Sequence, residues 1–338
     1  MSRSEHRVAV LLNPNAKRVS PRVRGAIASV VSPEDIFVSN TESDARSIAR
    51  TVVARGYETV FTGGGDGTFM GFLNKICDCV GSTRLPRFGI LRLGTGNALA
   101  SHVGACSARG AGLLDDLLRV RAGENGSVFE LDLVEADGLR CPFAGLGIDA
   151  QIINAYAAVK ARYRPLGRWV EGSLGYALAV ATKSIPHYVA HRRMPEIEVL
   201  NTGSTAFRLD WSGRPIGPAI EYGDVLYRGP AKVVAGSTLP HFGFDLRFFP
   251  FAGRRRGNMH LRIFSGSALG VVAHLRQTFR GTYFPKGVAD FYCQSVRIRT
   301  SRPMPLEIGG DPCGERTELN LKIADRPVEM VSFKRAAA

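Results

Sequence analysis

At Val60-Phe61-Thr62-Gly63-Gly64-Gly65-Asp66-Gly67-Thr68, a short apolar strand runs into a turn of glycines around a single aspartate. A similar turn ends the next apolar segment, at Gly89-Ile90-Leu91-Arg92-Leu93-Gly94-Thr95-Gly96-Asn97. Glycines keep Cβ atoms away from such turns, so backbone N–H groups can close on an anion such as a phosphate. The two turns together predict nucleotide binding, and hence an enzyme that transfers phosphoryl groups.

The residues around these turns, 7–130, alternate between strand and helix patterns. Strands are expected at 7–12, 35–39, 58–62 and 88–93, and helices at 21–31, from 41 onward, and at 69–80, 97–102 and 111–122. Such alternation predicts a doubly wound, mostly parallel α/β sheet with helices on both faces. Ligands of such sheets bind at the carboxyl ends of the strands, where Asn13-Pro14 and both glycine-rich turns fall.

From about residue 128 the pattern changes to strands with little helix between most of them. Strands are expected at 128–136, 142–146, 195–200, 207–211, 231–235, 244–249, 295–300, 306–308 and 319–323. Helical stretches are expected at 150–184 and 267–279. This pattern favours an antiparallel β-sandwich. We therefore predict an α/β nucleotide-binding domain at 1–130, with a segment at about 318–338 packing back onto it, and a β-sandwich domain at 131–317.

Composition narrows the class of protein. An apolar share of 45% suits two packed cores in 338 residues. No apolar run reaches the roughly 18 residues that a membrane-spanning helix needs, and the polar residues 1–7 suggest no signal peptide. The six cysteines form no C-x-x-C pair, so neither a zinc site nor a disulfide framework is expected and a cytoplasmic location fits.

The net charge of +14 is the one compositional outlier. A basic surface attracts nucleic acid, acidic proteins or anionic lipid headgroups. No recognised nucleic-acid module is visible in the sequence, so no nucleic-acid partner is expected. A basic surface with no dedicated partner is the alternative interpretation.

Six motifs follow one another along the chain in a fixed order: Asn13-Pro14, Thr41, Gly64-Gly65-Asp66-Gly67-Thr68, Gly94-Thr95-Gly96-Asn97, Phe143-Ala144-Gly145-Leu146-Gly147-Ile148-Asp149-Ala150 and Ile308-Gly309-Gly310-Asp311. In this order they resemble the diacylglycerol kinase catalytic family, which includes sphingosine and ceramide kinases and bacterial lipid kinases. The resemblance implies a lipid kinase whose active site lies in a cleft between the two domains. The chain departs from the family pattern at Gly71, where many members have a glutamate, and at Gly309-Gly310-Asp311, where they have D-G-E.

The resemblance also implies roles for individual residues. It assigns ten residues to ATP: Asn13, Thr41, Gly64, Gly65, Asp66, Gly67, Thr68, Gly94, Thr95 and Asn97. Thr41 could equally be a simple helix cap. The resemblance matches Asp149 to a position that contacts the lipid headgroup, although a lone acid before a helix is also a common N-cap.

Two aspartates are candidates for the chemistry of phosphoryl transfer. An aspartate beside phosphates needs a cation between them, so Asp66 either helps hold Mg²⁺ or accepts a proton as a base. Asp311 is the candidate general base by its match to the glutamate of D-G-E, with Glu315 as a nearby alternative. A surface turn is the competing interpretation of Gly309-Gly310-Asp311.

Two alternatives to a lipid kinase stay open. Thr202-Gly203-Ser204-Thr205-Ala206 resembles a segment of NAD kinases, which makes an NAD kinase the alternative enzyme. A non-catalytic nucleotide- or lipid-binding member of the family is the other alternative. The dinucleotide pattern at Gly145–Ala150 is discounted because it lies in the strand-rich half of the chain.

A lipid kinase without a membrane span must bind the bilayer surface reversibly. Phe248-Phe249-Pro250-Phe251 precedes Arg254-Arg255-Arg256, and apolar bulk beside cations is the chemistry of an interfacial anchor. A strand end with a solvated arginine turn is the competing interpretation. Peripheral association with an anionic membrane is therefore expected, and a homodimer is left open.

Overall fold

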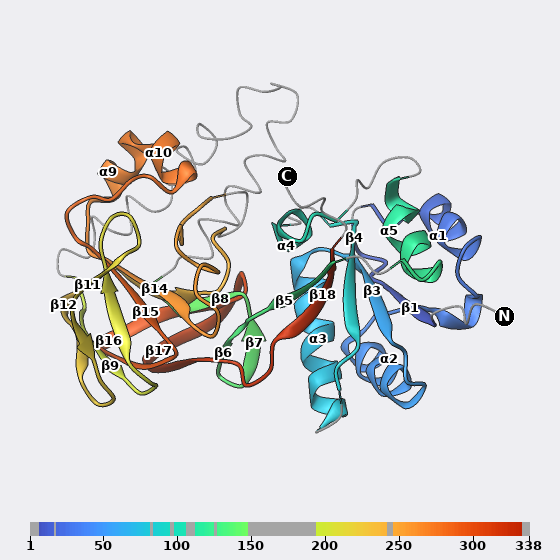
Figure 1. The fold of residues 1–338 in the computed structure, drawn as a ribbon, viewed down its shortest axis with the longest axis horizontal. Helices are drawn as coiled ribbons and strands as arrows, with labels where there is room; N and C mark the ends of the chain where they lie inside the picture. The colour runs from blue at the N-terminus through green and yellow to red at the C-terminus, as the bar shows by residue number, and fades with distance from the viewer. Residues whose placement is uncertain are drawn as a thin grey trace. The chain divides into compact units, whose positions relative to one another are not determined.

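The computed structural model describes residues 7–16, 18–81, 84–94, 98–105, 112–124, 127–147, 194–241 and 246–332. The chain divides into two compact units (Figure 1). Unit 1 comprises Met1–Leu131 and Arg326–Ala338, and unit 2 comprises Asp132–Asp325. The helix expected at 150–184 lies outside the described residues.

Unit 1 is built on a six-stranded sheet of order β2-β1-β3-β4-β18-β5. Its strands are β1 (Val8–Leu12), β2 (Ile36–Val38), β3 (Thr59–Gly64), β4 (Arg87–Arg92), β5 (Ser127–Leu131) and β18 (Val328–Ser332). Neighbouring strands are parallel except for β18 and β5, which are antiparallel. The predicted α/β class of this half of the chain is confirmed.

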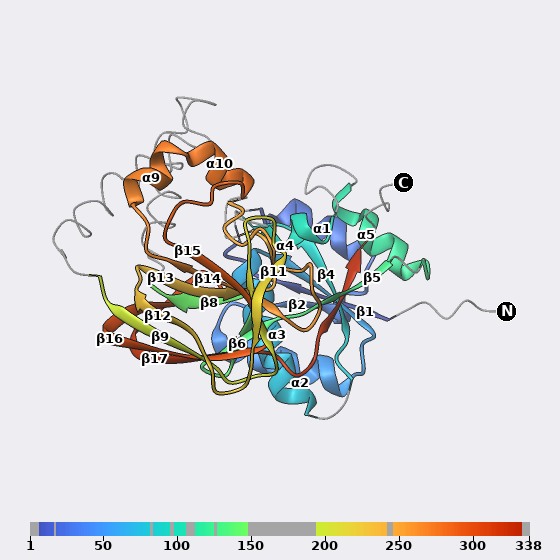
Figure 2. The ribbon, with the colours of Figure 1, turned by 60° about the vertical axis from the view of Figure 1, so that its left-hand side comes forward.

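Helices cover both faces of this sheet. They are α1 (Pro21–Ala28), α2 (Glu42–Ala54), α3 (Asp66–Val80), α4 (Ala98–His102) and α5 (Gly112–Arg121), with a 3₁₀ turn η1 at Pro33–Asp35. Figures 1 and 2 show α1 and α5 on one face and α2 and α3 on the other. Every residue of β1 is buried, which is why this strand reads as an unbroken apolar run rather than an alternating one.

The start of α2 is fixed by a reciprocal capping box. The backbone N–H of Asp44 donates to Thr41 Oγ1 at 3.1 Å, and the backbone N–H of Thr41 donates to Asp44 Oδ2 at 3.0 Å. Hydrogen bonds from the backbone N–H groups of Asn40 and Thr41 lower the pKa of Asp44. Thr41 therefore acts as the helix cap that the sequence suggested, and it also lies at the end of the loop after β2.

Unit 2 contains one connected antiparallel sheet of twelve strands. They are β6 (Val134–Ala136), β7 (Leu139–Cys141), β8 (Phe143–Leu146), β9 (Glu196–Asn201), β10 (Ala206–Leu209), β11 (Pro215–Ile220), β12 (Val225–Pro230), β13 (Val233–Ser237), β14 (Met259–Phe264), β15 (Val288–Cys293), β16 (Ser295–Ile308) and β17 (Asp311–Ile323). The main path runs β11-β10-β15-β14-β13-β8-β16-β17-β6-β7, and β9 and β12 branch from β16. The long strand β16 pairs with β9 over 296–300 and with β8 over 306–308, so the sheet divides along it.

A large antiparallel β domain was predicted for this half, and its presence is confirmed. Two short helices, α9 (Ala268–Ala273) and α10 (Leu275–Arg280), occupy the expected helical stretch at 267–279. The expected strand at 244–249 is wrong for its described part, because residues 246–249 belong to no strand. Their apolar side chains, including Leu246 and Phe249, are buried in a core cluster of this unit instead.

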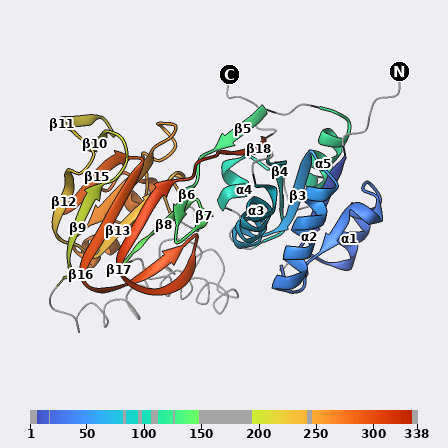
Figure 3. The same cartoon turned by 90° about the horizontal axis from the view of Figure 1, so that it is seen from below.

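The segment that returns to unit 1 is shorter than the sequence suggested. Residues 318–323 belong to β17, which pairs with β16 and β6 in unit 2. Of the described residues after β17, those of β18 join the sheet of unit 1, between β4 and β5 (Figure 3). No helix in the described part of the chain is long and apolar enough to cross a membrane.

Candidate nucleotide site

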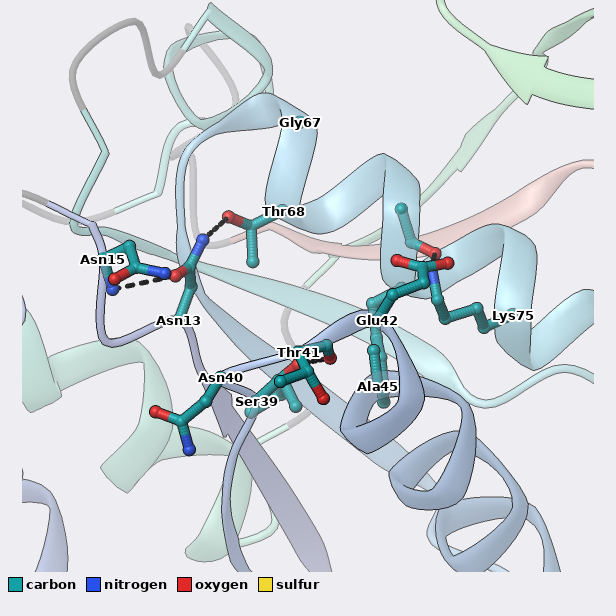
Figure 4. Close-up of a pocket in the computed structure, with 13 residues that line it drawn as sticks. Asn13, Asn15, Ser39, Asn40, Thr41, Glu42, Ala45, Gly67, Thr68 and Lys75 are labelled. Carbon is teal, nitrogen blue, oxygen red and sulfur yellow. Dashed lines mark hydrogen bonds and ion pairs between the residues drawn. The ribbon is translucent and has the colours of Figure 1, made fainter.

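A pocket of about 210 Å³ opens at the carboxyl edge of the unit 1 sheet (Figure 4). Three segments line it: Leu11, Asn13 and Asn15 at the end of β1 and just after it; Ser39, Asn40, Thr41, Glu42 and Ala45 before and in α2; and Gly67, Thr68, Gly71, Phe72 and Lys75 on α3. Parallel strands present their carboxyl ends at one edge, which brings these segments together. Four of the residues predicted to bind ATP therefore share one pocket: Asn13, Thr41, Gly67 and Thr68.

A hydrogen bond closes one end of this pocket. Asn13 Nδ2 donates to Thr68 Oγ1 at 3.0 Å, while Asn13 Oδ1 accepts from the backbone N–H of Asn15 at 2.9 Å. The backbone N–H of Asn13 also donates to Gly63 O at 3.0 Å. The turn after β1 is thus held against the first turn of α3, where backbone N–H groups are available to an anion.

The glycines of the two turns differ in how closely other atoms pack around them. A Cβ on Gly64 would lie 2.4 Å from Thr68 Oγ1, and a Cβ on Gly94 would lie 2.2 Å from Gly65 Cα. Gly64 and Gly94 are therefore required by the close packing of the turns themselves. A Cβ on Gly67 would meet nothing within 4 Å. Among the described glycines of these turns, Gly67 has the open surroundings that the phosphate-cradle interpretation expected.

Asp66 is the first residue of α3 and is half-buried. Its Oδ1 accepts a hydrogen bond from the backbone N–H of Leu99 at 3.1 Å, which links α3 to α4. No group of three or more His, Cys, Asp or Glu residues that could hold a metal occurs among the described residues. A single carboxylate nevertheless fits Mg²⁺ that is also held by substrate phosphates and water, so Asp66 would be its protein ligand.

Sequence reasoning missed an ion pair at the other end of the pocket. Lys75 Nζ lies 2.8 Å from Glu42 Oε1 and donates to Gly71 O at 3.2 Å (Figure 4). The Lys75 side chain is only 14% exposed, whereas that of Glu42 is 67% exposed. A Cβ on Gly71 would lie 4.0 Å from Lys75 Nζ, which is an ordinary contact distance.

The helical spacing of α3 could have revealed Lys75. Thr68, Gly71, Phe72 and Lys75 are spaced at i, i+3, i+4 and i+7, and they form the face of α3 that lines the pocket. Seven residues of helix separate Thr68 and Lys75 by about 10 Å along the axis. Polar groups therefore stand at both ends of the pocket.

Three predicted site residues lie outside the described residues: Thr95, Asn97 and Asp149. Gly94 is described, and its Cα packs against Gly65.

Asp311 lies in unit 2, at the start of β17. Ile308 pairs with Asp311 across a two-residue hairpin turn, in which Gly309 and Gly310 have φ of 61° and 100°. Such turns need positive φ, which glycine adopts without strain. Asp311 is exposed, as is Glu315 further along β17. The local structure is thus the surface turn that competed with the catalytic interpretation.

A second carboxylate near this hairpin was not singled out from the sequence. Glu307, on β16, is fully buried and pairs in register with Gly145 of β8 and Pro312 of β17. The β8 segment that carries the dinucleotide-like pattern pairs antiparallel with β13 and β16. Because β8 belongs to no parallel βαβ unit, discounting that pattern was correct.

The predicted interfacial anchor needs correction. Phe249 and Phe251 are buried within unit 2, at 0% and 2% exposure, and Phe248 is half-buried. These rings pack into the core clusters around Leu246 and Tyr292 and are not available to a membrane. The arginines that follow, Arg254–Arg256, are exposed.

The comparisons with known proteins agree with this fold. Residues 7–124 match the model of the diacylglycerol kinase catalytic domain, so the predicted resemblance to that family is confirmed. A solved diacylglycerol kinase from Bacillus anthracis str. Sterne aligns with a TM-score of 0.61 at 14% identity, covering 97% of both chains.

A provisionally assigned diacylglycerol kinase from the same organism aligns with a TM-score of 0.64 at 15% identity, covering 97% of this chain and 95% of its own. At such identities the likeness concerns the fold alone. A search of the curated proteins gave no significant match.

Proposed function

We propose that this protein is an ATP-dependent lipid kinase, which transfers the γ-phosphate of ATP to a hydroxyl of a lipid such as diacylglycerol or a sphingoid base. One observation carries the proposal: Asn13, Thr41, Gly67 and Thr68 converge on one pocket within a region that matches the diacylglycerol kinase catalytic domain. Association with an anionic membrane surface follows from a lipid substrate and is part of the proposal.

The pocket supports one orientation of the nucleotide. The positive end of the α3 dipole and its first-turn N–H groups favour phosphates beside Gly67 and Thr68. The base and ribose then extend along the lining face of α3 toward Lys75 and Glu42. There the ammonium group of Lys75 can donate hydrogen bonds to the nucleoside, and the carboxylate of Glu42 can accept them.

The transfer itself needs charge neutralisation and a proton acceptor. When bound, Mg²⁺ would neutralise charge on the phosphates, and Asp66 would be its ligand from the protein. A bond forms between the lipid oxygen and the γ-phosphorus as the bond to the ADP oxygen breaks. The hydroxyl proton goes to a carboxylate, either Asp66 or Asp311, as general base.

The test is phosphate transfer from labelled ATP with Mg²⁺ to a panel of lipid alcohols and to NAD. Asp66→Ala is the variant, and Asp78→Ala is its matched control, because Asp78 is an exposed acid on the same helix that does not line the pocket. We expect a phosphorylated lipid with wild-type protein and Asp78→Ala, and none with Asp66→Ala.

Other outcomes would decide against the proposal. Phosphorylated NAD in place of any lipid product would identify an NAD kinase. ATP binding without a product on any acceptor would identify a non-catalytic binding protein. Full activity in Asp311→Asn would assign the base role to Asp66.

A further inference from the structure

Trp211 is presented to solvent on a rigid turn of unit 2. Its side chain is 76% exposed and belongs to the turn between β10 and β11. Figure 3 shows β11 at one edge of the sheet. Asp210 Oδ1 accepts from the backbone N–H groups of Ser212 and Arg214 at 2.8 and 2.9 Å, and from Ser212 Oγ at 2.7 Å. The hydrogen bonds of Asp210 therefore order the backbone of the turn that carries the exposed ring.

The arginine loop packs directly against this turn. Arg254 Nη1 donates to Ser212 O at 3.0 Å, and its guanidinium lies 4.9 Å from the Phe251 ring centroid. A Cβ on Gly213 would lie 2.6 Å from a carbon of the same Phe251 ring. The turn and the loop thus share one buried ring and form one continuous surface.

Positive charge dominates this surface. Arg214, Arg254 and Arg255 are exposed, and the Arg255 guanidinium lies 4.7 Å from the Phe207 ring centroid. Asp210 is the acid of the turn, and the hydrogen bonds from Ser212 lower its pKa. Three cations against one carboxylate, beside an exposed indole, combine the two features of an interfacial membrane contact.

We propose that the Trp211 surface, defined as residues 210–214 with Arg254 and Arg255, docks on an anionic phospholipid bilayer. The proposal rests on the proposed lipid kinase function, since a membrane-resident acceptor requires such a contact. The arginines keep the role predicted for them, while Trp211 takes the place of the buried phenylalanines. An indole on a protruding turn suits the headgroup region, where its apolar ring is buried and its N–H stays hydrogen-bonded.

The chain has two tryptophans, so Trp169→Phe leaves Trp211 as the sole indole of the full-length protein. Its fluorescence is measured with phosphatidylcholine vesicles and with vesicles containing one quarter phosphatidylglycerol. We expect a blue shift and quenching by brominated lipid on the anionic vesicles, and neither change on the neutral ones.

Cosedimentation with the same vesicles, without ATP, tests the surface by substitution. We expect Trp211→Ala to weaken vesicle binding. The double variant Arg254→Ser/Arg255→Ser should also weaken it, by about fivefold for each arginine removed. Tyr222→Ala is the matched control, because Tyr222 is equally exposed at 76% but lies beyond the other end of β11, next to Glu221. This variant should bind vesicles as the wild type does.

Several results would overturn the proposal. One is a Trp211 fluorescence spectrum that does not change when anionic vesicles are added. Another is an equal loss of vesicle binding in Tyr222→Ala and Trp211→Ala. A third is Trp211-dependent binding to RNA without binding to vesicles.

Turnover of a short-chain, water-soluble lipid acceptor, which needs no membrane contact, separates this proposal from the proposed function. Turnover of that acceptor in Trp211→Ala with wild-type vesicle binding refutes the surface alone. Vesicle binding through Trp211 without turnover of any lipid refutes the kinase alone.

Discussion

Lys75 is the residue whose role the pocket geometry changes most. Its ammonium group is largely buried at the end of the pocket away from Thr68. We expect Lys75→Met to weaken ATP binding about tenfold, because a charge-assisted hydrogen bond to the nucleoside is lost. Binding of inorganic tripolyphosphate, which has no nucleoside, should be unchanged. Calorimetric titration measures both, and an equal loss for the two ligands would place Lys75 against the phosphates instead.

Asp66 combines a structural contact with a chemical role. Asp66→Asn keeps the oxygen that accepts from the backbone N–H of Leu99 but removes the charge. We therefore expect an unchanged melting temperature and a fall in kcat of at least about a hundredfold. Single-turnover assays and thermal melts of the same preparation give the two values. A kcat within a few-fold of wild type would remove Asp66 from the chemistry.

At the scale of elements, the contact between the two glycine-rich turns can be probed with a pair of substitutions. Gly94→Ala places a Cβ 2.2 Å from Gly65 Cα, whereas Gly67→Ala places one in open space. We expect Gly94→Ala to lower the free energy of unfolding by about 2 kcal/mol, as overpacking does. Gly67→Ala should leave it unchanged or slightly raised. Urea titration compares them, and similar stabilities would show that the turns separate easily.

The strands β14 and β15 share a buried polar cluster that makes stability depend on pH. His260 Nε2 lies 2.9 Å from Asp290 Oδ1, and Arg262 binds both oxygens of the same carboxylate. Burial lowers the pKa of His260. Burial opposes ionisation of Asp290, but the charges and hydrogen bonds of Arg262 and His260 together outweigh it and lower that pKa as well.

The sign of the effect follows from the lowered pKa of His260. As pH falls through about 6.5, the unfolded chain takes up a proton that the folded unit does not, so stability falls. We expect the urea midpoint to drop between pH 7.5 and 5.5, and to drop less in His260→Gln. The lowered pKa of Asp290 adds a further loss of stability only at more acidic pH, beginning where an ordinary aspartate titrates and continuing below it. Parallel pH profiles for wild type and variant would contradict the assignment.

At the scale of the whole molecule, the sheet of unit 1 is completed by β18, a strand that follows all of unit 2 in the sequence. It lies between β4 and β5 and buries Val328 and Met330. A chain ending at Asp325 exposes the edge of β4 and leaves β5 without its neighbour. We expect this chain to lose ATP binding and to be cleaved rapidly in unit 1 by limited proteolysis. Retained ATP binding would show that the pocket needs only β1 to β4.

The sequence predicted those parts of the fold that are encoded locally. The unbroken apolar run of β1, the capping box of α2 and the glycine-rich turn before α3 each depend on neighbouring residues. Elements that depend on distant partners were missed. β14 alternates His260 and Arg262 with apolar residues, and both are buried only because Asp290 lies on the adjacent strand. β11 was missed because it is an exposed edge strand containing two prolines.

In the candidate site too, the residues that belong to local motifs were predicted, and those that depend on packing between distant elements were not. Asn13, Thr41 and Thr68 were predicted because their motifs are short and contiguous. The pairing of Lys75 with Glu42 depends on how α2 packs against α3, which no local pattern encodes. The phenylalanines of residues 248–251 were misassigned for the same reason, since only the surrounding core shows that they are buried.

The position of β18 also bears on how the protein is made. A ribosome releases β1 to β5 first, then all of unit 2, and only afterwards the strand that separates β4 from β5. Unit 1 therefore keeps an incomplete sheet until the residues of β18 have been translated. Nucleotide binding by the nascent chain is therefore expected only after β18 has left the ribosome.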